Sequence, residues 1–124
     1  MHGPEQFFQD LDALGISYER RTATGGQWFA ILPAYEITSG QFQRRVIDLA
    51  LEAVHSYPQA VGSSVHVRSS PHLFDFTDSV PHVRNIIQSP LGEDWRYWSH
   101  NFAWAPGRTL DDLLGQVRMV FHRA

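Results

Sequence analysis

The sequence predicts an α+β fold in which two helices cover an antiparallel sheet. Two observations favour it: each end of the chain carries an amphipathic segment, and short runs rich in β-branched and aromatic residues lie between them, separated by glycine and proline. The expected order is an N-terminal helix, a four-strand antiparallel meander, a long loop and a C-terminal helix. Residues 1–124 are expected to form one domain, because a chain of this length with 43% hydrophobic residues can bury a single core.

The first helix is expected within residues 4–15. Its apolar side chains recur at helical spacing and share one face: Phe7, Phe8, Leu11 and Leu14. Pro4 suits the first turn of a helix and Gly15 suits a C-terminal cap. The segment therefore reads as a short amphipathic helix.

Four strands are expected to follow. Two strand-like runs within residues 16–36 flank the pair Gly25-Gly26, which permits the positive φ angles of a tight hairpin turn. Residues 43–58 are ambiguous, since alanine, leucine and glutamate favour a helix while the alternation around residues 47–53 favours a strand; we predict a strand. Val65 and Val67 flank a histidine in the fourth short run.

The remainder is expected to be a loop followed by a helix. The stretch from Pro71 to Trp95 contains several prolines and little periodicity, so it is predicted to be irregular. The final helix has Thr109 as its N-cap, and two aspartates in its first turn oppose the positive end of the helix dipole. Its apolar face comprises Leu110, Leu113, Leu114, Val117 and Phe121.

Composition excludes several classes of function. The net charge is −3 and the ten basic residues are scattered, so nucleic acid is not an expected partner. No apolar run is long enough to span a membrane and the N-terminus does not resemble a signal peptide, so a cytoplasmic protein is expected. The absence of cysteine excludes disulfides, thiolate metal sites and a thiolate nucleophile in this chain.

Histidines suggest no metal site. His66, His72 and His82 lack the spacing of a helical zinc site and have no recurring acidic partner. No cofactor is therefore expected.

Three runs of the sequence carry a resemblance to a known family: SYP at residues 56–58, WRYWSHN at residues 95–101 and WAPGRTLDDLLGQVRMVF at residues 104–121. Together with the order of elements, they resemble the ubiquitin-conjugating enzyme superfamily. The chain is similar to a divergent bacterial branch encoded beside ubiquitin-like proteins. The resemblance implies two partners, a ubiquitin-like protein and its activating enzyme. It also implies that the N-terminal helix and adjoining hairpin face that enzyme.

The superfamily's layout suggests a candidate site near Trp104. The cysteine of the superfamily has no counterpart, but Ser99 lies about where a nucleophile is expected, and a serine needs a neighbouring base. His100 or His82 is a candidate for that base, and Asn101 for the donor that stabilises an oxyanion. The contiguous His-Pro-Asn element of the superfamily is echoed only by His82 and Asn85.

These residues leave several readings open. Successive side chains of an extended segment point to opposite faces, so Ser99 and His100 need not act together. The three tryptophans of residues 95–104 are expected to form the walls of a core or groove. The chain is either a conjugating enzyme that carries the modifier as a serine oxyester, or a catalytically inactive scaffold that binds the modifier or its activating enzyme. A small-ligand-binding α+β domain of unrelated origin is the third reading.

Overall fold

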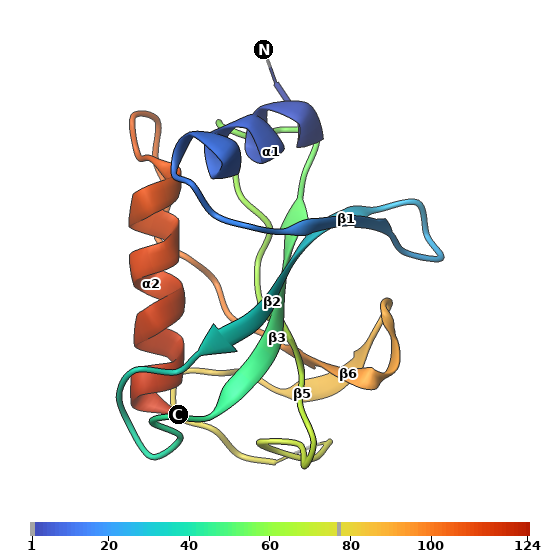
Figure 1. Cartoon of the computed structure of the whole chain (residues 1–124), viewed down its shortest axis with the longest axis vertical. Helices are drawn as coiled ribbons and strands as arrows, with labels where there is room; N and C mark the ends of the chain where they lie inside the picture. Colours follow the sequence, from blue (N-terminus) through green and yellow to red (C-terminus); the bar gives the residue numbers. More distant parts are fainter. Residues whose placement is uncertain (1, 77) are drawn as a thin grey trace.

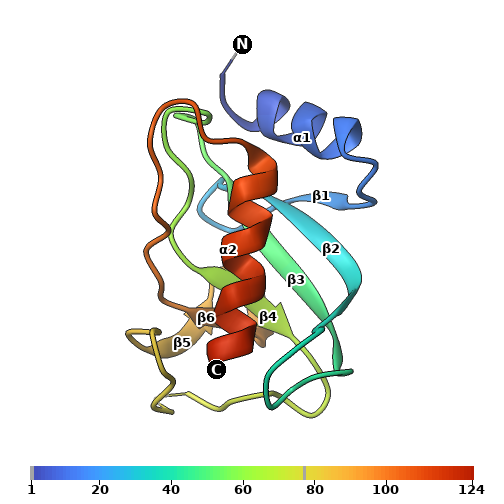
Figure 2. The same cartoon turned by 90° about the vertical axis from the view of Figure 1, so that its left-hand side faces the viewer.

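The structure is a computed structural model that describes residues 2–76 and 78–124. Its elements follow the order α1 (Pro4–Ala13), β1 (Glu19–Thr22), β2 (Trp28–Glu36), β3 (Val46–Ala53), β4 (Val65–Arg68), β5 (Ile86–Ser89), β6 (Gly92–Trp98) and α2 (Leu110–Arg123). The strands of this described part form one antiparallel sheet in the order β1-β2-β3-β4-β6-β5. Helix α2 lies across one face of the sheet, and α1 lies near one end of it (Figures 1 and 2).

The α+β class, both helices and the meander are confirmed, but the expected number of strands is wrong. Strands β1 to β4 pair in sequence order, as expected of a meander. The predicted irregular stretch from Pro71 to Trp95 contains β5 and the start of β6, so the described residues form six strands and not four. Strand β6 pairs with β4, and β5 pairs with β6 at the edge of the sheet.

Strand β6 was not predicted because its second half, from Trp95 to Trp98, is buried on both faces of the sheet. Trp95 belongs to a cluster on one face of the sheet and Trp98 to the main core on the other, and each is at most 1% exposed. An interior strand covered on both faces does not alternate between apolar and polar residues, so it lacks the period-2 signal. The prediction that these two tryptophans form walls of a core is confirmed.

Local sequence accounts for several boundaries. The ambiguous segment forms β3, as predicted, and its residues between Ile47 and Ala53 are mostly buried. The hairpin between β1 and β2 turns at Gly26, which has a φ of 86° that favours glycine. Helix α2 begins with a capping box in which the Asp112 carboxylate accepts a hydrogen bond of 2.9 Å from the backbone N–H of Thr109.

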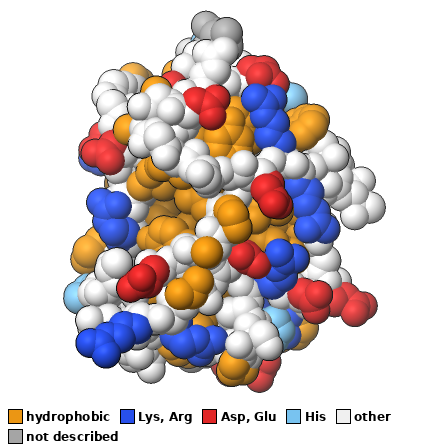
Figure 3. Space-filling view, viewed as in Figure 1, with side chains coloured by type: hydrophobic (Ala, Val, Ile, Leu, Met, Phe, Trp, Pro, Cys, Tyr) orange, Lys and Arg blue, Asp and Glu red, His pale blue; other side chains and the backbone are white. Residues whose placement is uncertain are grey.

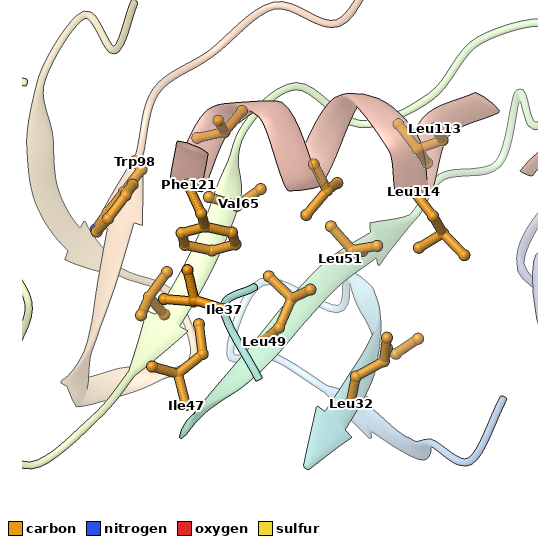
Figure 4. Close-up of a cluster of buried hydrophobic side chains, with 14 of the residues drawn as sticks. Leu32, Ile37, Ile47, Leu49, Leu51, Val65, Trp98, Leu113, Leu114 and Phe121 are labelled. Carbon is orange, nitrogen blue, oxygen red and sulfur yellow. The ribbon is translucent and has the colours of Figure 1, made fainter. Parts of the chain in front are cut away.

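The main core lies between α2 and the sheet. Phe121 of α2 packs against Trp98 of β6 with ring centroids 5.4 Å apart, and Trp98 also contacts Phe74. Figure 4 shows Phe121 and Leu114 of α2 pointing toward Leu49 and its neighbours on the strands. Among the described residues, no helix is long and apolar enough to cross a membrane.

Trp98 is predicted to be a major contributor to stability. Replacing Trp98 with alanine removes a fully buried ring, which typically costs about 3–5 kcal/mol of unfolding free energy. Trp28 is 38% exposed, so Trp28→Ala is a matched control with a smaller expected loss. Urea unfolding followed by circular dichroism measures both, and equal losses in the two variants would contradict this description of the core.

Candidate functional site

The candidate site begins where β6 ends, and Ser99 continues the pairing of that strand. The Ser99 N–H donates a hydrogen bond of 3.0 Å to the carbonyl of Asn85, and the Ser99 carbonyl accepts one of 2.9 Å from the N–H of Arg84. On the other side, the carbonyl of His100 accepts a hydrogen bond of 2.7 Å from the N–H of Ser64. The backbone of Ser99 and His100 is therefore held between two neighbouring segments.

The alternation of side chains separates Ser99 from His100. Trp98 faces α2, whereas Tyr97 contacts His66, which packs on Phe29 of the cluster on the opposite face of the sheet. Because successive side chains of an extended segment point to opposite faces, Ser99 is directed to the face of Tyr97, and His100 to the face covered by α2. The two adjacent residues do not form a nucleophile and base pair.

The Ser99 hydroxyl is partly accessible, but no neighbouring base activates it. Its side chain is half-buried. Within residues 2–76 and 78–124, no side chain makes a hydrogen bond to its hydroxyl. A serine hydroxyl is a weak nucleophile until a base takes its proton, so this arrangement does not by itself activate Ser99.

The structure brings His100 and His82 together. His100 Nδ1 lies 2.8 Å from the backbone carbonyl oxygen of His82. Because a carbonyl only accepts, Nδ1 carries the proton and donates it, which leaves Nε2 as the acceptor nitrogen of the neutral ring. The side chains of both histidines line a cavity of about 180 Å³ together with four residues of α2: Gln116, Met119, Val120 and Arg123.

Asn101 lies apart from these histidines. Its side chain is exposed and lines a different cavity, of about 280 Å³, between the segment of residues 59–63 and Trp104. Asn85, the other candidate counterpart of the superfamily's asparagine, does not join these histidines either. Its backbone carbonyl accepts the hydrogen bond from Ser99, and its side chain is exposed. The four predicted site residues thus fall into three separate environments.

The segment after Asn101 is fixed to its surroundings. Gln116 of α2 donates one hydrogen bond to the carbonyl of Ala103 and accepts one from its N–H, each 2.8 Å long. The indole N–H of Trp104 donates to the carbonyl of Pro58 over 2.8 Å, and the ring of Trp104 lies near that of Tyr57. Trp104 is therefore a half-buried structural side chain, as predicted.

Tyr57 links this region to α1. Its hydroxyl donates a hydrogen bond of 2.5 Å to the carboxylate of Asp10. Burial, and then the hydrogen bond to Asp10, raise the pKa of Tyr57 above its ordinary value. The phenol consequently stays protonated and serves as a structural donor.

Sequence reasoning missed a buried pair formed by His66 and Ser89. His66 Nδ1 and Ser89 Oγ are hydrogen-bonded at 2.8 Å, and both residues are at most 3% exposed. The Ser89 oxygen also accepts a hydrogen bond of 3.1 Å from the N–H of Leu91, so it braces the turn between β5 and β6. No sequence signal links two residues 23 positions apart, and their burial excludes a macromolecular substrate.

Sequence reasoning also missed a cavity lined by several charged and polar side chains. It measures about 720 Å³ and its lining includes Asp48, Arg68, His72 and Asp94. Arg68 is already paired with Asp48 at 2.9 Å and its guanidinium lies over the ring of Trp95. The part of the chain that the structure describes contains no group of three or more metal-ligating side chains. The lining also includes Ser69 and Ser70, so hydroxyl, imidazole and carboxylate side chains all border this cavity, although none of them was predicted to belong to the site.

The fold is a six-stranded antiparallel sheet with two helices among the described residues, and the chain contains no cysteine. A family model described as prokaryotic E2 family E matches residues 4–123. The chain therefore belongs to prokaryotic E2 family E, which indicates a role in a bacterial ubiquitin-like conjugation pathway. No curated protein and no solved structure matches the chain. The predicted resemblance to a bacterial branch of the superfamily is confirmed. The chain has no cysteine, which is consistent with a member that lacks the catalytic cysteine.

The buried His66 predicts a pH dependence of stability. Burial lowers the pKa of His66 to about 4, whereas the unfolded chain has an ordinary histidine pKa of about 6.5. Stability is thus complete above about pH 6.5 and falls as the pH drops toward 4, because the unfolded state alone takes up the proton.

The test compares unfolding free energies of wild type and His66→Gln across that range. The wild type should lose about 3 kcal/mol more than the variant between pH 6.5 and pH 4. His55→Gln is the control, because His55 is exposed and its replacement should leave the dependence of the unfolding free energy on pH unchanged. A slope unaffected by His66→Gln would contradict a neutral, buried His66.

Proposed function

We propose that this chain is a binding component of a bacterial ubiquitin-like conjugation pathway that docks the activating enzyme without carrying the modifier covalently. The observation that supports it most strongly is the separation of Ser99 from His100 and Asn101 in a chain that has no cysteine. A carrier needs a nucleophile, a base and an oxyanion donor around one reacting atom. Here the residues predicted for those roles, Ser99, His100 and Asn101, face different surroundings, so docking is the function that the geometry supports best.

Helix α1 and the hairpin beside it supply the proposed docking surface. Glu5 of α1 pairs with Arg20 of β1 at 2.8 Å, and the guanidinium of Arg20 lies 4.4 Å from the ring centroid of Phe8. These contacts join α1 and β1 into one surface. Asp12 and Leu14 are exposed on it, and Leu14 is 45% exposed.

The surface combines the features of a protein interface. In Figure 3 acidic side chains lie over the region that α1 occupies in Figure 1, and hydrophobic side chains are exposed below them, bordered by charges of both signs. Apolar area contributes to affinity, and charges around it steer the encounter. We therefore assign the activating enzyme, and not a small molecule, to this face.

A serine oxyester carrier remains the second candidate. What favours it is the half-buried Ser99 hydroxyl, which no described side chain engages, placed before Trp104 as the superfamily's layout predicts. This candidate requires a base from a partner or a rearrangement that brings His82 or His100 to Ser99. An oxyester is less activated than a thioester, so it depends strongly on such a base.

An adduct assay separates the two candidates. The chain is mixed with ATP and with the ubiquitin-like protein and activating enzyme encoded in the same genome, and intact mass is measured. Docking without transfer predicts no mass increase in wild type. An adduct that survives thiol reductant, is cleaved by mild hydroxide and disappears in Ser99→Ala would establish the carrier instead. Ser99→Cys is the positive control for position, since thiolate is the better nucleophile.

The negative charge of Asp12 is predicted to raise the rate of association with the activating enzyme. Asp12→Lys should lower the association rate with the activating enzyme by about fivefold at low salt, and by less at high salt, while dissociation changes little. Glu93 is an exposed acidic residue on β6, so Glu93→Lys is the control for net charge. Stopped-flow or surface-based kinetics measure both variants, and equal effects would place the docking surface elsewhere.

A further inference from the structure

The small cavity near the C-terminal end of α2 gathers basic side chains. It measures about 180 Å³, and the residues that line it are basic or neutral: His82, His100, Gln116, Met119, Val120 and Arg123. None of these described lining residues carries a carboxylate side chain. The donors and acceptors of this cavity therefore indicate which ligand it suits.

The imidazole of His100 is held in one orientation at this cavity. Its Nδ1 donates a hydrogen bond of 2.8 Å to the carbonyl of His82, and its ring packs edge-on against Phe102 with centroids 5.0 Å apart. A neutral ring that donates through Nδ1 keeps Nε2 as an acceptor. His100 thus contributes an acceptor nitrogen whose place is fixed before any ligand arrives.

The backbone of His82 adopts a conformation that costs energy. Its φ of 63° lies in the left-handed region, which residues other than glycine adopt infrequently. Such conformations are concentrated at ligand sites and active sites. Here the conformation places the carbonyl of His82 on His100, while the ring of His82 lines the same cavity. Within residues 2–76 and 78–124, neither the ring of His82 nor the guanidinium of Arg123 makes a hydrogen bond or ion pair.

These side chains favour an anion over a metal ion. The guanidinium of Arg123 is always charged in proteins, so it repels a cation and attracts an anion. The part of the chain that the structure describes also contains no group of three or more metal-ligating side chains. An anion can accept hydrogen bonds from Arg123 and from the ring of His82. Because Nε2 of neutral His100 only accepts, a matching anion must also carry a donor.

We propose that this cavity binds a phosphate group that retains a proton, either free hydrogen phosphate or the monoprotonated form of a phosphate monoester. The phosphate oxygens accept hydrogen bonds from Arg123 and His82, and the P–OH donates to Nε2 of His100. Sulfate and carboxylates carry no proton near neutral pH, so they cannot form the bond to His100. Arg123 and His82 are exposed, so water screens the charges and we expect a Kd of about 1 mM.

Titration of the wild-type chain with inorganic phosphate at neutral pH, followed by ¹H–¹⁵N correlation spectra, tests the site. Saturable shifts should centre on His82, His100 and Arg123, and sulfate at equal ionic strength should bind about tenfold more weakly. Arg123→Gln should weaken phosphate binding about tenfold. Arg118→Gln is the matched control, because Arg118 is an exposed residue of the same helix that does not line the cavity.

Three results would overturn the proposal. They are the absence of saturable shifts up to about 20 mM phosphate, equal affinities for phosphate and sulfate, and equal losses in Arg123→Gln and Arg118→Gln.

Two further variants separate ligand binding from folding. His82→Gly removes the ring but suits the left-handed backbone, so the chain should stay folded while phosphate binding falls about fivefold. His100→Phe removes the acceptor nitrogen, so the preference for phosphate over sulfate should disappear. A preference that survives in a folded His100→Phe variant would contradict the bond to Nε2.

A titration with O-phosphoserine distinguishes the two sources of the phosphate group. Tighter binding than that of inorganic phosphate would support a phosphorylated side chain as the ligand. Weaker binding would support free phosphate, because the cavity of about 180 Å³ would then hold no more than the phosphate group itself.

Discussion

The burial of Trp98 is the constraint on which the rest of the structure depends. The indole lies between the sheet and α2, against Phe121, and is fully buried. A side chain fixed on one face of a strand determines the faces of its neighbours, so Ser99 and His100 are directed away from each other. The chemistry available at the candidate site is therefore set by packing in the core.

The same packing explains why the candidate site residues are held by separate hydrogen bonds and lie apart from one another. Gln116 ties Ala103 to α2, Trp104 is tied to Pro58, and Nδ1 of His100 is occupied by the carbonyl of His82. Each polar group is used to satisfy backbone groups, as buried or half-buried polar groups usually are. The surface of α1 and β1, which we propose as the docking surface, lies apart from these contacts.

Much of the fold could be predicted from the sequence because its signals are local. Neighbouring residues are enough to predict the cap at Thr109, the apolar face of α2 and the turn at Gly26. Strand β6 could not be found in this way, since Trp95 and Trp98 are buried on opposite faces and the strand shows no alternation. The sequence predicted that the site residues lie together. Where they lie depends on backbone pairing between Ser99 and Asn85, and no pattern of neighbouring residues predicts that pairing.

The most direct test of this account is the protonation of the His100 imidazole, observed by long-range ¹H–¹⁵N correlation in wild type and in Ser99→Ala. The account predicts that the neutral ring carries its proton on Nδ1, held by the carbonyl of His82, and that the spectrum of this ring is the same in both proteins. A ring protonated on Nε2 would contradict the hydrogen bond from His100 to the His82 carbonyl. Nitrogen shifts that change when the Ser99 hydroxyl is removed would show that the serine and the histidine interact, and would contradict their separation.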